Sequence, residues 1–215
     1  MTDLAARLLR LYTGAVADVL DAIGYRDQVL PAAIAPVSQE MKIAGPAFPG
    51  RGEPTEDMSH NDTAQRLAML ESVTPGSVSI WDCGSHDASA HWGEIMTRAV
   101  AARGCVGAVV DGGLRDTGFV LDLQFPVFCR FRSPASSIGR WDIVEWNCDI
   151  QIGSTAIHPG DWVFGDIDGV VVVPADVVTE VIAKAEDKVS AEEKMRVDLD
   201  AGARPSEVFE RHGSF

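Results

Sequence analysis

Apolar side chains recur at helical spacing near the start of the chain. They are Leu4, Leu8, Leu11, Ala15, Val19 and Ile23. Steps of three and four residues place such positions on one face of a helix. Thr13-Gly14 interrupts the pattern, so residues 4–23 are predicted to form two short helices in succession. Residues 29–52 are rich in proline and glycine and are predicted to be irregular chain with a short strand.

A helix and a strand are predicted next. The helix covers residues 63–71, and Asp62 is a candidate cap for its first turn. Thr74-Pro75-Gly76 has the composition of a turn and ends this helix. The apolar run that follows, residues 77–81, is predicted to be a buried strand.

A second helix is predicted over residues 93–103, followed by a buried strand over 107–111 and a tight turn at Gly112-Gly113. Together with the strand at 77–81, these segments make a strand–helix–strand unit. Such units usually place their strands in a parallel sheet, with the functional loops at the C-terminal ends of the strands.

Short strands dominate the chain after Pro126. They are predicted over residues 127–131, 140–146, 150–152, 162–165 and 170–173. A long helix is predicted over 175–201, apolar at its start and largely charged from residue 186 to residue 200. A charged helical extension is usually solvated, but it can also reach a neighbouring subunit. The patterns together predict an α/β fold whose second half is mostly β.

The composition excludes several classes of protein. With 46% hydrophobic and 23% charged residues, a chain of 215 residues can form a substantial core, and one domain over 1–215 is predicted. The net charge of −14 disfavours nucleic acids and anionic membranes as partners, because both attract clustered lysine and arginine. The sequence has neither an apolar run of about 20 residues nor a secretion signal at its start. A cytoplasmic location is therefore expected.

Four cysteines, Cys83, Cys105, Cys129 and Cys148, lie 19 to 24 residues apart. No pair has the close spacing of a zinc knuckle or a redox motif. Cysteine in an apolar strand behaves as a small hydrophobic residue, so buried free thiols are predicted.

The start of the helix at 93–103 is the first candidate binding element. Its opening residues are Gly93-Glu94-Ile95-Met96. The first turn of a helix carries backbone N–H groups without intrahelical partners and the positive end of the helix dipole, which together can hold a carboxylate. Gly93 has no Cβ to keep a ligand away from the backbone. A small 2-oxo acid carries a carboxylate suited to this position.

The second candidate element follows the strand at 107–111 and contains Arg115 and Asp116. Arg115 can bind a carboxylate through two parallel hydrogen bonds. Asp116 can give a hard oxygen ligand to a Mg²⁺ or Mn²⁺ ion that keeps most of its water molecules. A surface ion pair between the two side chains is the alternative that the local sequence leaves open.

His86, Asp87 and His91, with Asp82 nearby, form another polar group. Their spacing is not a recognised pattern of metal ligands, and Mg²⁺ sites favour oxygen. A structural role or a contact with substrate is therefore the preferred interpretation. The group comes just before the helix at 93–103, so either histidine could line a pocket there.

Gly93-Glu94, twenty intervening residues and Arg115-Asp116 resemble the acid-X20-Arg-Asp signature of the class II pyruvate aldolases. That family includes 4-hydroxy-4-methyl-2-oxoglutarate aldolases, oxaloacetate decarboxylases and relatives named as regulators of ribonuclease E activity. Further segments that are similar to the family lie at residues 13–24, 43–48, 102–112, 159–162 and 166–174. The resemblance thus covers roughly residues 10–202 of this chain, in order.

The resemblance implies roles for the residues of the signature. Asp116 would bind the metal directly, and Glu94 would hold metal-bound water. Arg115 would contact the substrate carboxylate and a catalytic water. The backbone amides of Ile95 and Met96, which follow Gly93-Glu94, would bind the pyruvyl carboxylate.

The resemblance also implies an assembly. The fold would be a layered swivelling β/β/α domain, and the protein a homotrimer or a homohexamer with sites between subunits. The C-terminal helix and tail, about residues 175–215, would lie at that interface. One acid of this helix would complete the outer shell of the metal in an adjacent subunit. Glu192 is the first choice for that acid and Glu193 the second.

Three functions are consistent with these features. The first is a Mg²⁺- or Mn²⁺-dependent lyase that releases pyruvate from 4-hydroxy-2-oxo acids and decarboxylates oxaloacetate. The second is a related enzyme that acts on a different 2-oxo acid, and the third is a non-catalytic regulator that binds a ribonuclease. The presence of Glu94, Arg115 and Asp116 together favours an enzyme. The group at C4 of the substrate is not predicted.

Overall fold

The computed structural model describes residues 2–57 and 63–213, and its elements follow the predicted order closely. The helices are α1 (Asp3–Leu8), α2 (Thr13–Ala22), α3 (Thr63–Ser72), α4 (Glu94–Ala102), α5 (Thr117–Asp122), α6 (Val178–Asp200) and α7 (Pro205–His212). The strands are β1 (Ala35–Pro36), β2 (Ile43–Pro54), β3 (Val78–Asp82), β4 (Ala90–Trp92), β5 (Gly107–Leu114), β6 (Val127–Arg132), β7 (Trp141–Trp146), β8 (Ile150–Ile152), β9 (Thr155–Ile157), β10 (Trp162–Asp166) and β11 (Gly169–Val173). Asp62, the expected cap of α3, lies outside the described residues.

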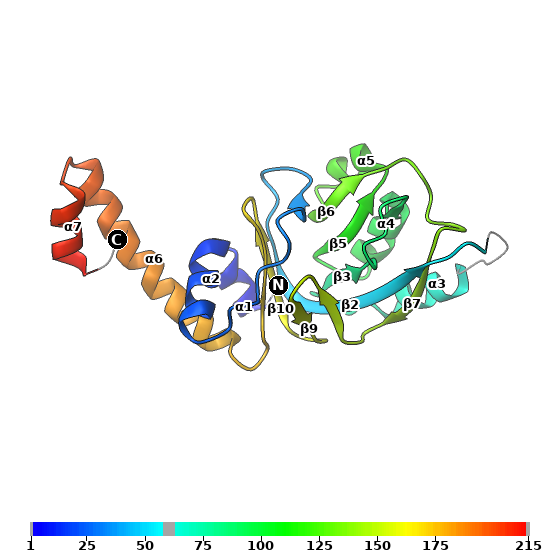
Figure 1. The fold of residues 1–215 in the computed structure, drawn as a ribbon, viewed down its shortest axis with the longest axis horizontal. Helices are drawn as coiled ribbons and strands as arrows, with labels where there is room; N and C mark the ends of the chain where they lie inside the picture. Colours follow the sequence, from blue (N-terminus) through cyan, green and yellow to red (C-terminus); the bar gives the residue numbers. More distant parts are fainter. Residues whose placement is uncertain (1, 58–62, 214–215) are drawn as a thin grey trace.

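Nine strands of the described chain form one mixed sheet. Along its main path the order is β1-β6-β5-β3-β2-β10-β11, while β4 pairs with β5 and β7 pairs with β2. β3, β5 and β6 are parallel neighbours, which confirms the predicted strand–helix–strand unit. β2 runs antiparallel to both β10 and β7, and the sheet curls around this long strand (Figure 1). β8 and β9 form a separate hairpin.

Three apolar clusters hold the layers together. One lies between β3, β5, β6 and the helices α3, α4 and α5. A second joins α1, α2 and α6 to the strands β10 and β11. The third fills the inside of the curled sheet and is closed by the hairpin of β8 and β9. Helices thus cover two separate parts of one sheet, and the predicted layered α/β fold is confirmed.

The expectation of irregular chain over residues 29–52 was wrong for its second half. Residues 43–54 form the longest strand of the sheet. Its glycines are sites of close packing: a Cβ on Gly50 would lie 2.6 Å from Cη2 of Trp81, and one on Gly52 would overlap the ring of Trp141. A bulge between Arg51 and Gly52 shifts the register against β7. The glycines therefore let indole rings cross the strand.

The predicted turn at Gly112-Gly113 was also wrong, because β5 continues through both residues to Leu114. A Cβ on Gly112 would overlap Nδ1 of His91, and one on Gly113 would lie 2.6 Å from Cε2 of Phe131. Both glycines are required by the packing of neighbouring side chains against the strand.

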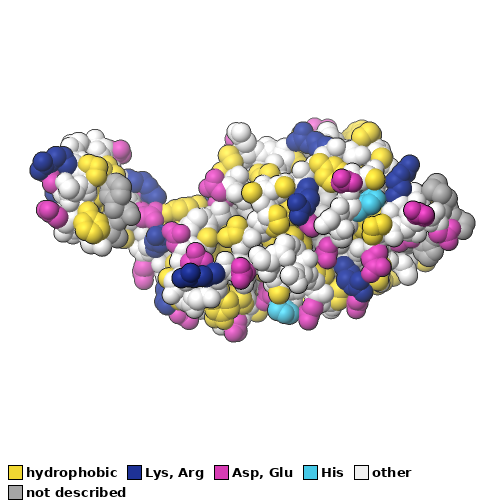
Figure 2. Space-filling view, in the orientation of Figure 1, with side chains coloured by type: hydrophobic (Ala, Val, Ile, Leu, Met, Phe, Trp, Pro, Cys, Tyr) yellow, Lys and Arg dark blue, Asp and Glu magenta, His cyan; other side chains and the backbone are white. Residues whose placement is uncertain are grey.

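The C-terminal helix extends beyond the body of the molecule. α6 packs on α1 and α2 through its first turns, and α7, which was not predicted, folds back onto its end (Figure 1). The end of α6 and α7 form an arm that is separated from the main mass in the space-filling view (Figure 2). None of the described helices is both long and apolar enough to cross a bilayer.

The four cysteines are free thiols, as predicted. Cys83, Cys105 and Cys129 are buried, whereas Cys148 is partly exposed. Burial raises the pKa of the Cys129 thiol to about 11, and it also raises the pKa of the Cys83 thiol well above its ordinary value. Such thiols carry little thiolate and are poor nucleophiles.

Candidate active site

The first wall of the candidate site is the N-terminus of α4. Gly93 precedes this helix in an extended conformation, and no side chain caps the helix there. The carbonyl of Gly93 accepts the first intrahelical bond from the amide of Thr97 at 3.0 Å. Because the amides of the first turn have no intrahelical acceptors, those of Ile95 and Met96 are available to an anionic ligand.

The second wall is the end of β5. The strand is buried along its whole length, and the chain then turns at Asp116, which has left-handed backbone angles (φ 57°, ψ 31°). Asp116 stands at the N-cap position of α5 but makes no capping hydrogen bond. Its carboxylate lies beside Arg115 instead, with Oδ2 3.5 Å from the guanidinium Nε. The conformation thus turns a common capping residue toward the pocket.

A backbone hydrogen bond joins the two walls. The amide of Arg115 donates to the carbonyl of Trp92 at 3.0 Å. A Cβ on Gly93 would lie 2.9 Å from Oδ2 of Asp116 and 3.1 Å from Cγ of Arg115. Glycine at this position is therefore necessary for the acid and the guanidinium to approach the start of α4.

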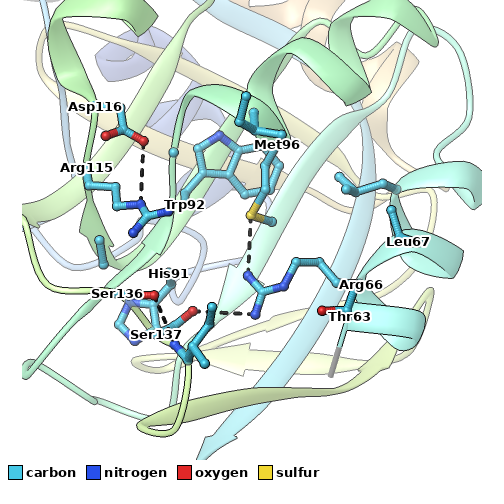
Figure 3. Close-up of a pocket in the computed structure, with 15 residues that line it drawn as sticks. Thr63, Arg66, Leu67, His91, Trp92, Met96, Arg115, Asp116, Ser136 and Ser137 are labelled. Atoms are coloured by element: carbon cyan, nitrogen blue, oxygen red, sulfur yellow. Dashed lines mark hydrogen bonds and ion pairs between the residues drawn. The ribbon is translucent and has the colours of Figure 1, made fainter. Parts of the chain in front are cut away.

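The two walls open onto one pocket of about 310 Å³, drawn in Figure 3. Gly93, Ile95, Met96, Arg115 and Asp116 all line it, so the structure brings these predicted residues together. The opposite wall comes from α3 and from the loop before β7. The side chains of Arg115 and Asp116 are 42% and 39% exposed, which leaves both accessible from the pocket.

Glu94 is near this pocket but its side chain has another partner. One carboxylate oxygen accepts a hydrogen bond of 2.7 Å from Nε of Arg98, one helical turn later. The Glu94 side chain is 20% exposed and is not part of the pocket wall. Its contact with metal-bound water stays a prediction.

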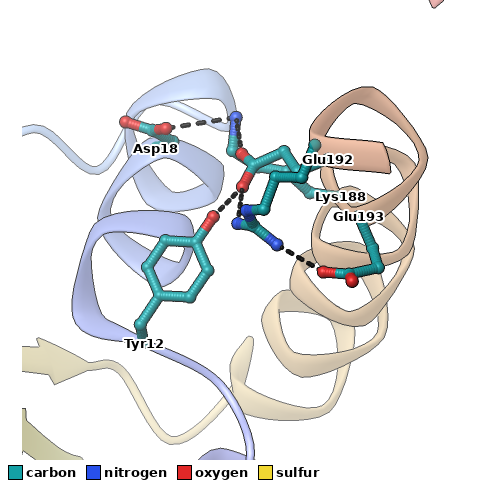
Figure 4. A network of polar contacts seen from close by, with 6 residues as sticks. Tyr12, Asp18, Lys188, Glu192 and Glu193 are labelled. Carbon is teal, nitrogen blue, oxygen red and sulfur yellow. Dashed lines mark hydrogen bonds and ion pairs between the residues drawn. The ribbon is translucent and has the colours of Figure 1, made fainter. Parts of the chain in front are cut away.

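Glu192 and Glu193 lie on α6, far from α4 in the same chain (Figure 1). Glu192 accepts hydrogen bonds from the Tyr12 hydroxyl and from Arg196, and it is 3.4 Å from Nζ of Lys188 (Figure 4). Glu193 contacts Arg196 at 2.9 Å, and its side chain is 68% exposed against 26% for Glu192. Either acid would reach a site only in another subunit, and Glu193 is the more accessible of the two.

His86 and His91 form an edge-to-face pair next to the site. Nδ1 of His91 accepts a hydrogen bond of 3.0 Å from the amide of Gly113. Its proton is therefore on Nε2, which donates to Nδ1 of His86 at 2.9 Å. Burial, the neighbouring His86 and the charge of Arg66 lower the pKa of His91 to about 4. His91 also lines the pocket, so a structural role at the pocket wall is what the structure supports.

No group of three or more His, Cys, Asp or Glu side chains in residues 2–57 and 63–213 is arranged to hold a metal ion. A cation at Asp116 would thus depend on water and substrate for most of its ligands, as Mg²⁺ commonly does. The open position of the Asp116 carboxylate beside Gly93 is compatible with such an ion.

Two parts of the pocket were missed from the sequence. Arg66 on α3 and Ser137 in the loop before β7 lie on the wall opposite Arg115 (Figure 3). Neither belongs to a local motif, since both reach the pocket only through tertiary packing. Arg66 lies within the helix predicted over residues 63–71, and the residues next to it in the sequence form no recognised binding motif.

Comparisons with known proteins identify relatives of this chain. The chain is 30% identical over 206 residues to Protein DlpA of Legionella pneumophila. The aligned region covers 94% of this chain but 32% of that longer protein. It is 29% identical over 191 residues to a Halalkalibacterium halodurans protein named "Putative 4-hydroxy-4-methyl-2-oxoglutarate aldolase", covering 89% of this chain and 86% of the relative.

A solved structure has the same fold. It is that of Streptomyces coelicolor RraAS2, described as an unusual member of the RNase ES inhibitor RraA protein family. The TM-score is 0.83 at 27% identity, covering 92% of this chain and 98% of that one. The model of the RraA-like family, described as Aldolase/RraA, matches residues 13–172. The resemblance read from the sequence is confirmed, and the chain belongs to the RraA-like (Aldolase/RraA) family.

Proposed function

We propose that this protein is a divalent-metal-dependent lyase that cleaves 4-hydroxy-2-oxo acids to pyruvate and also decarboxylates oxaloacetate. Substrates of the 4-hydroxy-4-methyl-2-oxoglutarate or 4-carboxy-4-hydroxy-2-oxoadipate type fit this proposal. The observation that carries it is the convergence of the uncapped start of α4 with Arg115 and Asp116 on one pocket. The aldolase names of relatives support the reaction class.

Asp116 would hold the metal directly, with Glu94 acting through a water molecule. Glu192 of an adjacent subunit, or Glu193 in its place, would complete the outer shell. The cation, Mg²⁺ or Mn²⁺, would supply Lewis-acid stabilisation for the charge that develops on the keto oxygen during cleavage. The exposed carboxylate of Asp116 and the missing Cβ at Gly93 leave room for a hydrated ion.

The residues of the chain would orient the substrate and move its protons. The amides of Ile95 and Met96 and the guanidinium of Arg115 would bind the carboxylate at C1. A water molecule held by Arg115 and an acid would accept the proton of the C4 hydroxyl. The C3–C4 bond then breaks, a carbonyl forms at C4, and the bonding electrons form the enolate of pyruvate, which is protonated at C3.

Oxaloacetate would react at the same bond. Its C4 is a carboxylate carbon, so breaking C3–C4 releases CO₂ and leaves the same enolate of pyruvate. The same groups that stabilise the enolate in the aldol reaction would therefore serve both reactions.

A subunit interface over the pocket is part of the proposal. Ile95, Leu67 and Ile138 line the pocket and are 71%, 54% and 58% exposed. Apolar side chains gathered around one opening are typical of a surface covered by another chain. A homotrimer or homohexamer in the cytoplasm, bound to a small 2-oxo acid, would cover them and bring α6 of a neighbour to the site.

Pyruvate release, coupled to lactate dehydrogenase, tests the function. 4-Hydroxy-4-methyl-2-oxoglutarate and oxaloacetate would be assayed with Mg²⁺, with Mn²⁺ and with a chelator. Asp116→Asn keeps the backbone preference but removes the charge, and it should abolish release. Asp122→Asn, on the exposed end of α5, is the matched control and should keep wild-type activity.

Absence of metal-dependent release from both compounds would refute the lyase assignment. Two further experiments then distinguish the other two candidate functions. A screen of further 2-oxo acids tests a related enzyme. A ribonuclease inhibition assay tests a non-catalytic regulator, which the likeness to RraAS2 makes the relevant second function.

A further inference from the structure

The floor of the candidate pocket is apolar. Leu70, Trp92 and Met96 line it and are only 7%, 2% and 9% exposed. Met96 and Trp92 are drawn between Arg115 and the side chains of α3 (Figure 3). The groups that would bind the metal and the C1 carboxylate are thus at one end of the pocket, and the apolar floor extends away from them toward α3.

Polar groups beside this floor already have partners within the chain. The indole Nε1 of Trp92 donates a hydrogen bond of 2.9 Å to Oγ1 of Thr97. Both ring nitrogens of His91 are bonded, Nδ1 to the amide of Gly113 and Nε2 to His86. A ligand group that lies on the floor therefore meets hydrocarbon, sulfur and the faces of rings.

Arg66 is also engaged, at the side of the pocket. Its guanidinium donates to Sδ of Met96 at 3.8 Å and to Oγ of Ser137 at 3.4 Å, and it has a further interaction of its own. A ligand that stays on the floor does not need to displace these contacts.

Burial decides which ligand group suits such a floor. Removing one CH₂ group from water strengthens binding by about fourfold. A carboxylate on the floor would lose its water and gain no hydrogen bond from the groups beneath it, which is unfavourable. The floor therefore distinguishes an apolar group from a carboxylate of similar size.

We propose that the floor formed by Leu70, Trp92 and Met96 binds an apolar group attached at C4 of the substrate. This inference rests on the proposed function, which places the C1 carboxylate at α4 and Arg115. The preferred substrates are then 4-hydroxy-2-oxo acids with an aliphatic chain at C4, which are cleaved to pyruvate and an aliphatic aldehyde or ketone. A carboxylate at C4 is accepted where it can point to the opening, as in 4-hydroxy-4-methyl-2-oxoglutarate, whose methyl group would lie on the floor.

Two substrates of equal length test the assignment. 4-Hydroxy-2-oxopentanoate carries a methyl group at C4, and 4-hydroxy-2-oxoglutarate carries a carboxylate there. Cleavage between C3 and C4 gives pyruvate from both, with acetaldehyde from the first and glyoxylate from the second. With pyruvate measured by chromatography, kcat/KM should be about 10-fold or more higher for the methyl compound. 4-Hydroxy-2-oxohexanoate, which has one more CH₂ group, should gain a further factor of about four.

Met96→Gln makes the floor polar with little change in side-chain volume, and it keeps the backbone amide that would bind the C1 carboxylate. It should lower kcat/KM for 4-hydroxy-2-oxohexanoate by about 10-fold, and it should reduce the preference for methyl over carboxylate to less than about threefold. Ile167→Gln is the matched control. It introduces the same amide at a side chain that is 55% exposed between β10 and β11, outside the pocket lining, and it should alter neither value.

A binding series needs neither the variant nor the reaction. Calorimetric titration in Mg²⁺ would compare 2-oxopentanoate with 2-oxoglutarate, which has a carboxylate in place of the terminal methyl group, and would then extend to 2-oxohexanoate. Wild type should bind 2-oxopentanoate about 10-fold more tightly than 2-oxoglutarate and 2-oxohexanoate about fourfold more tightly again. The heat-capacity change of binding should become more negative as the chain grows.

The outcomes are distinct. Equal kcat/KM for the methyl and carboxylate substrates, or a preference that survives in Met96→Gln, would overturn the apolar site for C4 while leaving the lyase intact. Absence of pyruvate from all three substrates would refute the proposed reaction. In that case, an affinity that rises with chain length would still uphold the apolar floor, and an affinity that does not rise would overturn it.

Discussion

Replacing His91 with asparagine tests how the neutral imidazole at the pocket wall is held. The ring is 3% exposed and packs edge-on against Trp141, with ring centroids 4.9 Å apart. Its Nδ1 must stay unprotonated to accept the bond from the amide of Gly113. Asparagine can offer a carbonyl oxygen to the same amide, but it does not titrate in this range.

The sign of the effect follows from the two states of the chain. In the folded protein the pKa of His91 is lowered from 6.5 to about 4, chiefly by burial. In the unfolded chain the ring takes up its proton near pH 6.5, so between these values the unfolded state binds more protons. The free energy of unfolding therefore falls as the pH is lowered from about 6.5 to about 4. At about 1.4 kcal/mol for each pH unit, the loss from this residue is about 3 kcal/mol.

Urea unfolding followed by tryptophan fluorescence gives the measurement, repeated at pH values between about 4 and about 7.5. Wild type should lose about 3 kcal/mol more than His91→Asn over this range, even if the variant is less stable at neutral pH. Parallel curves for wild type and His91→Asn would show that the buried ring is not held neutral and would refute the reasoning.

Three further changes concern stability. Gly113→Ala should cost about 1–3 kcal/mol in a thermal or urea melt, because its Cβ would meet the ring of Phe131 and the backbone carbonyl of Ser89, just before β4; unchanged stability would contradict the close packing. Asp166→Asn should cost about 1–3 kcal/mol by the same measurement, since Asp166 is buried and accepts bonds of 2.8 and 2.7 Å from the amide and hydroxyl of Thr13. Arg7→Met breaks a partly exposed ion pair with Glu186 and should cost less than about 1 kcal/mol; a larger loss would show that α1 depends on this contact.

Local signals were sufficient to predict most elements of the fold. Helical spacing of apolar residues identified α1 and α2, and apolar runs identified β3, β10 and β11. The start of α4 and the Arg115-Asp116 pair were also predictable, because a glycine before a helix and a charged pair after a buried strand are local features. The sequence could not place Arg66, whose position depends on how α3 packs against the sheet.

The errors concern glycines, and they share one physical cause. A glycine pair suggests a turn because glycine tolerates positive φ, but neither Gly112 nor Gly113 has a positive φ. What these positions require is the absence of a side chain, since His91 and Phe131 occupy the space. A sequence does not distinguish the two requirements, because the second depends on residues far away in the chain.

The absence of a side chain at a glycine also brings the parts of the candidate site together. Gly93 admits the carboxylate of Asp116 and the stem of Arg115 to the start of α4, and the amide of Arg115 is bonded to the strand that leads into that helix. The group that would hold the metal and the amides that would hold the substrate carboxylate are thereby held next to each other. A side chain at residue 93 would push these two groups apart without removing either of them. Gly93 is therefore as important for the geometry of the candidate site as Arg115 and Asp116, the charged residues that lie against it.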